Sequence, residues 1–404
     1  MTGSQQAVIQ LPSPLPVAAR ILLGWFSRLR RGRMEGQMPD GEPFLIQGAE
    51  SGPTGSIRLH RPTRMVARIA TRGSVGFAES YMAGDWSSPD TAHLLELMLR
   101  NEDAFSRNME PHWLHRLRLA LRHRGRSNTR RGSRRNIAAH YDLGNEFYRH
   151  WLDETMTYSA AIFEHPDQPL AEAQRHKYQQ LLDAIGARPG EHILEIGCGW
   201  GGFAMEAARR GIRVTGLTLS TEQLAWARSR IAEAGFSDLV ELRLQDYRDT
   251  AGQFDHAVSI EMLEAVGEDY WPAYFRMLHD RIRPGGRVGL HGITIDEQRY
   301  EDYRRRPDFI QRYIFPGGML PSPTRLEQEC RAADLAVTDS TGLGQHYAAT
   351  LVQWDSRFVR ALPEIRALGF DERFINMWRY YLAYCYAGFR TGTIDVKRLV
   401  LTRP

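Results

Sequence analysis

Short apolar segments alternate with longer segments of helical period in the second part of the chain. The apolar segments span residues 192–198, 213–219, 240–246, 256–262 and 287–293. Helical patterns at 200–210 and 221–235 separate the first three of them. Strands that alternate with helices are typical of a parallel sheet covered by helices on both faces. The pattern therefore predicts an α/β domain over residues 136–404.

The first part of the chain shows a different pattern. Residues 43–70 predict short strands punctuated by glycine and proline, and residues 74–100 predict helices. The first 40 residues are mixed in character, and we expect an extension that is ordered only in part. The predicted organisation is an extension at 1–40, a smaller lipid-associated α+β domain at 41–115, a linker at 116–135 and the α/β domain at 136–404.

Composition narrows the class of protein. The 404 residues are 42% hydrophobic and 25% charged, which is typical of a soluble globular protein and excludes a collagen, a mostly disordered chain and a polytopic membrane protein. The first apolar run, 14–26, contains Arg20, and neither a membrane span nor a secretory signal is expected. Three widely spaced cysteines predict neither disulfides nor a metal site and indicate a reducing cytoplasm.

Nine arginines and no acidic residue lie between Arg116 and Arg135. The later part of this segment has no apolar period, so it is either a solvated linker or a surface that docks on phosphate groups. The segment lacks interleaved aromatic residues, and no nucleic acid partner is expected. An anionic membrane surface, to which each basic residue contributes about 1 kcal/mol, fits the second interpretation.

The candidate cofactor loop runs from Gly197 to Gly201, between a predicted strand and a predicted helix. Glycines at such a turn let backbone N–H groups approach a ligand closely. The loop alone suits NAD, FAD or S-adenosylmethionine. A dinucleotide fold usually places an acidic residue about 20 positions on, but the next strand ends at Thr218 without a carboxylate. Glu195 before the loop and Asp246 after a later strand are typical of class I methyltransferases. Cys198 is interpreted as a packing residue.

At these residues the chain resembles the cyclopropane-fatty-acid synthases, including the mycolic-acid cyclopropane synthases. The resemblance rests on HYDLGNEFY (140–148), TYSAAIF (157–163), LEIGCGWGGF (194–203), GLTLSTEQ (216–223), LQDYRD (244–249), SIEMLEAVG (259–267), LHGIT (290–294), IFPGGMLPS (314–322) and HYAATL (346–351). Residues 74–86 resemble the extra domain of the bacterial phospholipid-modifying members. The resemblance implies a class I, Rossmann-like methyltransferase domain, a smaller N-terminal α+β domain and S-adenosylmethionine as cofactor.

The resemblance also assigns cofactor contacts residue by residue. It implies that Tyr158 and Ser159 close over the cofactor and that three glycines form the turn beneath it: Gly197, Gly199 and Gly201. It implies that neutral side chains replace the missing ribose carboxylate and that polar residues border the adenine; these are Thr218, Gln223, Gln245, Asp246 and Tyr247. The alternative for these hydroxyl and amide groups is ordinary turn and cap chemistry, with Ser220 starting a helix.

The reaction implied by the resemblance is the attack of an alkene on the sulfonium methyl, which leaves a carbocation. A base then removes a proton, and water must be excluded. The family holds a bicarbonate ion as base, and Glu264, His291 and Tyr347 match three of its ligands. Ala160 and Ala265 stand where the family usually has cysteine and histidine, so bicarbonate is left open. Glu146 is offered as a protein base in its place.

The expected substrate is a membrane phospholipid with an unsaturated acyl chain. The expected product is a cyclopropane or a methyl- or methylene-branched chain. A small-molecule N- or O-methyltransferase and an inactive homologue that only binds lipid or cofactor are the alternatives. We expect a cytoplasmic enzyme at the inner membrane face, and a homodimer is left open.

Overall fold

The computed structural model describes residues 8–10, 15–109 and 143–404 of the chain, so the arginine-rich segment 116–135 lies outside the described residues. The chain forms two compact units, each described by itself. Unit 1 comprises residues 1–122, 306–312 and 365–391, and unit 2 comprises residues 123–305, 313–364 and 392–404.

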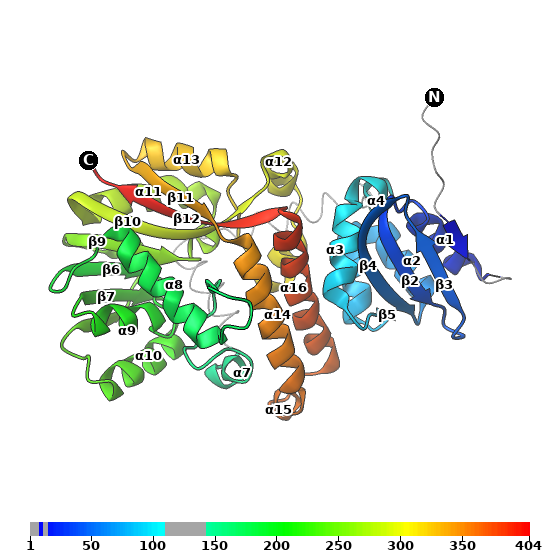
Figure 1. The fold of residues 1–404 in the computed structure, drawn as a ribbon, viewed down its shortest axis with the longest axis horizontal. Coiled ribbons are helices and arrows are strands. Elements are labelled where there is room, and N and C mark those ends of the chain that lie inside the picture. The colour runs from blue at the N-terminus through cyan, green and yellow to red at the C-terminus, as the bar shows by residue number, and fades with distance from the viewer. Residues whose placement is uncertain (1–7, 11–14, 110–142) are drawn as a thin grey trace. The chain divides into compact units, whose positions relative to one another are not determined.

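Unit 2 is built on a seven-stranded sheet (Figure 1). Its strand order is β11-β12-β10-β9-β6-β7-β8. The strands are β6 (His192–Ile196), β7 (Arg213–Thr218), β8 (Val240–Leu244), β9 (Phe254–Ile260), β10 (Ile282–Ile295), β11 (Ala336–Gly342) and β12 (Ile394–Thr402). The strands from β8 to β10 in this order are parallel, and β12 is antiparallel to both β10 and β11. The five predicted strands are confirmed; β11 and β12 were not predicted.

Helices cover both faces of this sheet. They are α7 (Asn145–Arg149), α8 (Leu170–Ile185), α9 (Gly202–Arg209), α10 (Thr221–Glu233), α11 (Trp271–Arg281), α12 (Glu297–Arg305), α13 (Pro323–Ala332) and α14 (Gly344–Arg360). Because successive strand residues point to opposite faces, Ile193 joins a core with α8, α9 and α10, and Leu194 joins a core with α11 and α13. The predicted α/β class is confirmed.

The strand order changes direction beside β6, which lies between β7 and β9. The chain runs outward from β6 through β7 and β8, then returns to the other side for β9 and β10. In open α/β sheets, ligands bind beyond the carboxyl ends of the strands at such a switch point. The loops after β6 and β9 are therefore the first place to look for a site.

Unit 1 contains a five-stranded sheet of order β1-β3-β2-β4-β5. Its strands are β1 (Val8–Gln10), β2 (Arg31–Gln37), β3 (Pro43–Gln47), β4 (Glu50–Leu59) and β5 (Trp86–Ser87). Its helices are α1 (Val17–Phe26), α2 (Pro62–Met82), α3 (Thr91–Arg100), α4 (Glu102–Met109) and α16 (Glu372–Thr391). The short helix α15 (Leu362–Ala367) and the π-helical turn at Ile310–Ile314 fall at boundaries between the units.

Two features of unit 1 differ from the sequence-based expectation. The expectation of partial order does not hold for residues 15–40, because α1 buries Leu22 and Phe26 and β2 pairs with two neighbouring strands. The second feature is α16, which the sequence-based boundaries assign to the α/β domain. It packs on α2 and α3 in unit 1. Among the described residues, no helix is long and apolar enough to cross a membrane.

Candidate active site

The glycine loop after β6 has a backbone that favours glycine. Gly197, Gly199 and Gly201 have φ values of 83°, 51° and 83°, in the left-handed region that other residues rarely adopt. A Cβ placed on Gly199 would meet no atom within 4 Å, so open space lies beside this turn. A Cβ on Gly197 would lie 3.0 Å from Cγ of Met262, which places the loop after β9 next to the glycine turn. This cradle fits a cofactor that approaches the backbone closely.

Glu195 lies on β6 just before this turn and is 4% exposed. Burial raises the pKa of this carboxyl group to about 8, so it is mostly protonated at neutral pH. Its Oε2 atom has no hydrogen-bond partner among the described residues. A neutral carboxyl group with a free oxygen can donate a hydrogen bond to a ligand at the carboxyl end of β6.

The predicted ribose and adenine residues lie at the carboxyl ends of β7 and β8. The Thr218 hydroxyl donates to Oε1 of Gln223 at 3.1 Å, and the backbone N–H of Gln245 donates to the Thr218 carbonyl oxygen at 3.1 Å. Asp246 is ion-paired with Arg248 at 2.7 Å. Ser220 caps α10 by accepting from the N–H of Gln223, so the cap chemistry considered as the alternative is present. These contacts leave the predicted cofactor roles as proposals.

Tyr247 follows directly and is 7% exposed. Burial raises its pKa to about 12, so the phenol stays neutral. Its ring meets the ring of Tyr274 edge-on, with 5.3 Å between centroids. The ring therefore belongs to the core beneath the end of β8 and supplies an apolar surface there.

The segment that carries Tyr158 and Ser159 is held by α8 and α14. The N–H of Ala161 donates to the hydroxyl of Thr350 on α14 at 3.0 Å, and Gln174 on α8 donates to the carbonyl oxygen of Ser159 at 2.8 Å. The aromatic side chains around Tyr158 have ring centroids 5.3 to 5.6 Å from its own; they are Tyr148, Trp151 and Trp354. Tyr158 thus lies in an aromatic wall, as a residue covering a ligand would.

Helix α7 is fastened to the glycine loop by Asn145. Its Oδ1 accepts from Nε1 of Trp200 at 2.7 Å, and its amide donates to the Glu222 carbonyl oxygen at 3.2 Å. The neighbouring Glu146 points elsewhere: its side chain is 53% exposed and forms an ion pair with Arg149 at 3.1 Å. The structure thus places Glu146 on the surface, where solvation is its default role.

Glu264, His291 and Tyr347 come from three separate segments, and a fourth residue, Glu261, connects two of them. The N–H of Glu261 donates to the carbonyl oxygen of His291 at 2.9 Å, and its carboxylate accepts from the Tyr347 hydroxyl. Oε1 of Glu264 accepts from the N–H of Ile293, two residues beyond His291. Glu261 and Glu264 interact electrostatically, so three of the four predicted catalytic residues, Glu264, His291 and Tyr347, belong to one cluster, and Glu146 does not.

The charges of this cluster are unusual for buried groups. Burial, and then the negative charge of Glu261, raise the pKa of Glu264 to about 8. Burial lowers the pKa of His291 well below its ordinary value, so the ring is neutral. Both ring nitrogens of His291 and Oε2 of Glu264 lack hydrogen-bond partners among the described residues. Unpaired buried polar atoms are costly, and here they indicate a binding site for a ligand.

Lys177 on α8 adds a buried amine to this cluster. It is fully buried and donates to Oγ of Ser159 at 2.6 Å and to Oε1 of Gln174 at 2.7 Å. Burial lowers its pKa to about 7, although the negative charges of Glu261 and Asp153 act to raise it. Lys177 thus supplies positive charge next to Glu261 and fixes Ser159 at the same time.

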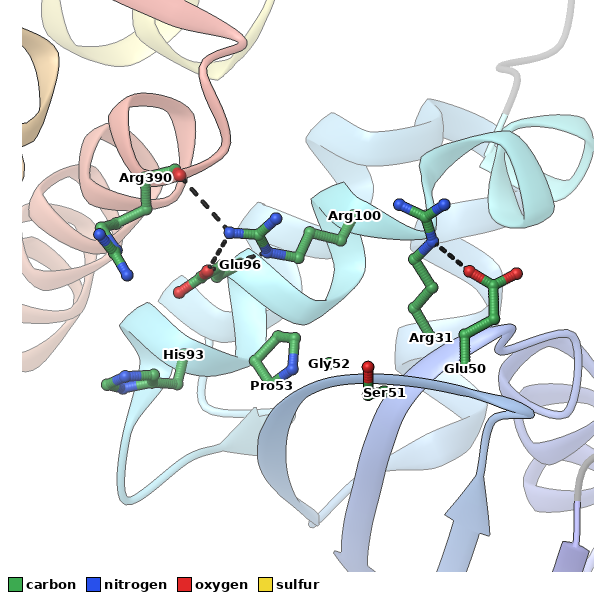
Figure 2. A pocket seen from close by; sticks show the side chains of 9 residues that line it. All are labelled: Arg31, Glu50, Ser51, Gly52, Pro53, His93, Glu96, Arg100 and Arg390. Atoms are coloured by element: carbon green, nitrogen blue, oxygen red, sulfur yellow. Dashed lines mark hydrogen bonds and ion pairs between the residues drawn. The ribbon is translucent and has the colours of Figure 1, made fainter.

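Unit 1 has a recess of its own, shown in Figure 2. Its arginines are engaged: Arg31 pairs with Glu50 at 2.6 Å, and Arg100 pairs with Glu96 at 2.8 Å and donates to the carbonyl oxygen of Arg390 at 3.5 Å. Arg31 and Arg100 are thus each paired with a glutamate, unlike the unpaired groups of the unit 2 cluster.

The comparisons with known proteins identify the family of this chain. The family model described as mycolic acid cyclopropane synthetase matches residues 128–399. The chain belongs to this family. It is 44% identical over 365 residues to the tuberculostearic acid methyltransferase UfaA1 of Mycobacterium tuberculosis, covering 88% of this chain and 85% of that protein. It is 34% identical over 348 residues to the cyclopropane-fatty-acyl-phospholipid synthase of Escherichia coli K12, covering 86% and 87%.

Solved structures place the methyltransferase unit in the same family. The mycolic acid cyclopropane synthase CmaA1, solved as a complex with SAH and CTAB, matches with a TM-score of 0.63 and 32% identity over 66% of this chain and 97% of that one. A coclaurine N-methyltransferase at 18% identity and a TM-score of 0.62 shares the fold alone. This cyclopropane synthetase-family protein is a class I S-adenosylmethionine-dependent methyltransferase.

Two site residues of this methyltransferase were missed by sequence reasoning. Glu261 stands three residues before Glu264 and was passed over as part of an apolar strand. Lys177 was passed over because a lysine on a helix is usually exposed. Two signals were available for Lys177: it lies in the apolar stripe of its helix with Ala173 and Leu181, and it is one of only two lysines among 52 basic residues. Unlike arginine, a buried lysine can lose its charge.

Proposed function

We propose that this enzyme transfers the methyl group of S-adenosylmethionine to the double bond of an unsaturated acyl chain in a phospholipid. The observation that carries the proposal is the meeting of two features: the glycine cradle after β6, and the cluster formed by Glu261 and Glu264 after β9, His291 on β10 and Lys177 on α8. Gly197 and Met262 bring the two features into contact.

The chemistry of the cluster suits an alkene. When the π-electrons of an alkene attack the sulfonium methyl, the sulfur leaves as a neutral thioether and a carbocation remains on the chain. Such a cation needs a base and must be kept from water. The cluster supplies buried carboxyl groups, and the aromatic wall of Tyr148, Trp151, Tyr158 and Trp354 supplies π-faces, which attract cations.

We propose that the product is a methylated, open-chain acyl group. The relative that is 44% identical is named a methyltransferase, whereas the relative that is 34% identical is named a cyclopropane synthase. Ala160 and Ala265 stand where the family usually has cysteine and histidine. Both differences alter the surroundings of the base, and we take them as further support for the open-chain product.

The test is lipid analysis of cells with and without the protein. Both products gain one CH₂ group, so intact mass cannot separate them, and NMR of the methyl esters is required. Olefinic signals from a methylene or allylic methyl group support the open-chain product. A high-field cyclopropane signal contradicts the proposed open-chain product but still supports the proposed lipid substrate. Methylated small molecules without any lipid change support an N- or O-methyltransferase, and cofactor binding without turnover supports an inactive homologue.

Two observations outside the cluster support a phospholipid substrate. The Escherichia coli relative is named a cyclopropane-fatty-acyl-phospholipid synthase. The arginine-rich segment 116–135 has the charge required to reach an anionic inner membrane face. Binding and turnover are measured on vesicles of anionic phospholipid and on vesicles of zwitterionic phospholipid with the same unsaturated chains. Equal binding and turnover on both would remove the electrostatic part of the proposal.

A further inference from the structure

Glu261 has a backbone conformation that is unfavourable for its type. Its φ is 50°, and among the described residues only Met156 and Asp334 share a positive φ without being glycine. Glu261 directly follows β9, beside the switch point of the sheet, and its N–H is bonded to His291 on β10. A side chain held in such a conformation at a ligand-binding edge is a candidate for function.

Two hydrogen-bond donors and one cationic side chain converge on the Glu261 carboxylate. The backbone N–H of Ala160 donates to Oε1 at 2.8 Å, the Tyr347 hydroxyl donates to the carboxylate, and the Lys177 ammonium attracts it. These three groups come from the loop before α8, from α14 and from α8. Together they form a site for one anion, and the chain's own carboxylate fills it.

A second backbone N–H group in this cluster already donates to a carboxyl group. The N–H of Ile293, on the β10 side of the cluster, donates to Oε1 of Glu264. A free bicarbonate ion, which the family resemblance implies, would need the backbone N–H at Ala160, which Glu261 already occupies. It would also meet two carboxyl groups. The residues present therefore do not fit bicarbonate.

Glu261 is also placed to reach a substrate. Glu261 and Glu264 are both half-buried, so part of each residue remains accessible to a ligand. Met262, the residue after Glu261, lies against Gly197 of the cofactor turn. The carboxylate is thus on the same side of the sheet edge as the loop that would hold the methyl donor.

We infer that Glu261 is the base of the reaction and takes the place of a bicarbonate ion, an inference that rests on the proposed function. The alkene π-pair forms the bond to the methyl carbon, and the S–CH₃ bond breaks with its electrons on sulfur. The Glu261 carboxylate then accepts one proton from the cationic chain. The C–H electron pair closes a ring or, after a hydride shift, forms a double bond. One CH₂ group is gained in either case.

The first experiment uses the unaltered enzyme. Methyl transfer to vesicles of unsaturated phospholipid is measured in buffer freed of carbon dioxide, with and without added bicarbonate. We expect equal turnover in both. Turnover that is lost without bicarbonate and restored by it would overturn the inference while leaving the methyltransferase function in place. An enzyme that methylates no lipid under either condition would instead refute the proposed function.

Two substitutions test the base directly. Glu261→Gln keeps the shape but removes the base, and turnover should fall about 100- to 10,000-fold with unchanged affinity for S-adenosylmethionine. Glu261→Gly suits the left-handed φ and opens the anion site, so added bicarbonate or formate should restore part of the lost turnover. A merely structural role for Glu261 predicts no such rescue.

The matched control is Asp334→Gly, which places glycine at another left-handed position, with φ of 56°, on the exposed surface. Its turnover should equal that of the unaltered enzyme. Full turnover of Glu261→Gln would overturn the inference. If circular dichroism shows that Glu261→Gly does not fold, Glu261→Gln and the bicarbonate measurement on the unaltered enzyme decide the question.

Discussion

The two sides of the switch point in unit 2 are built in different ways. On the β6–β7 side, the cofactor cradle is a single continuous stretch, Gly197–Gly201, whose glycines are required by the backbone itself. On the β9–β10 side, the cluster of Lys177, Glu261, Glu264 and His291 draws its residues from α8, the loops after β9 and the strand β10. A local backbone requirement is visible in a sequence, whereas a cluster of distant side chains is formed only by folding.

The largest expected effect tests the cofactor cradle on the β6–β7 side. Gly199→Val should abolish binding of S-adenosylmethionine, because its side chain would enter the open space beside the turn and because valine is strained at a φ of 51°. Calorimetry gives the affinity, and circular dichroism checks the fold. The control is Gly235→Val, which carries the same strain at a φ of 74° with no atom within 4 Å. Unchanged affinity in folded Gly199→Val would refute the cradle.

The arginine-rich segment 116–135 extends the comparison to a third region, continuous in sequence like the cradle but outside the described residues. Replacing Arg130, Arg131, Arg134 and Arg135 by serine should weaken binding to anionic vesicles by about 1 kcal/mol per arginine. The effect should shrink with salt, because exposed charges are screened within about 8 Å at physiological ionic strength. Vesicle sedimentation is the measurement.

Its control replaces an equal number of exposed arginines that lie on separate elements: Arg188, Arg331, Arg360 and Arg373. This control should sediment with vesicles as the unaltered protein does. If both variants bind equally well at low salt, residues 116–135 are only a linker.

The next effect tests the cluster on the β9–β10 side of the switch point. Lys177→Met removes the ammonium that favours the charged form of Glu261, so burial should then favour the protonated carboxyl group. Turnover near neutral pH should fall roughly 10- to 100-fold, as a loss of one to two pKa units of stabilisation implies. Steady-state methyl transfer measures it. The control is Lys397→Met, because Lys397 pairs with Asp395 at a partly exposed site. Equal loss in both variants would show that Lys177 has no special role.

The last effect is on stability rather than on binding or turnover, and it concerns Glu195. Its folded pKa of about 8 lies above the ordinary value of 4.5, so its contribution to stability is fully present below 4.5 and is lost as pH rises through 8. Glu195→Gln should remove a slope of about 1.4 kcal/mol per pH unit in that window. Denaturant unfolding without cofactor at several pH values measures this slope. A variant whose stability varies with pH as steeply as that of the parent contradicts a buried, neutral Glu195.

Much of the fold could be predicted from the sequence, for reasons visible in particular elements. The strands β6, β7 and β9 are buried over most of their length and are therefore largely apolar, whereas the edge strand β8 alternates buried and exposed residues, as the period of a half-buried strand predicts. β12 was missed because its polar positions, such as Lys397 and Arg398, hide the strand pattern. α1 was missed because its short apolar run lies among arginines and prolines and was interpreted as an extension.

The site residues also fall into two groups: those that a local motif predicted and those that only the folded structure identified. Gly197, Gly199 and Gly201 adopt the backbone that the motif predicts, and Glu264, His291 and Tyr347 prove to belong to one cluster. Glu146 was offered as a base because of its place near a motif, and the structure shows it exposed beside Arg149. Glu261 was overlooked because its neighbours made it look like part of the strand, and only its contact with Ala160 revealed it.

The sequence by itself determined the α/β fold, the cofactor turn and the family, since each depends on local order: strand periodicity, glycines with positive φ, and motifs in fixed succession. Only the tertiary structure decided where the charges lie. Burial, which no local pattern gives, made Lys177 a stronger acid than an exposed lysine and left His291 without a hydrogen-bond partner among the described residues. Folding also brought the Glu261 carboxylate to donors from two separate segments, at Ala160 and Tyr347. A desolvated group has the charge that its surroundings allow, and those surroundings exist only in the folded chain.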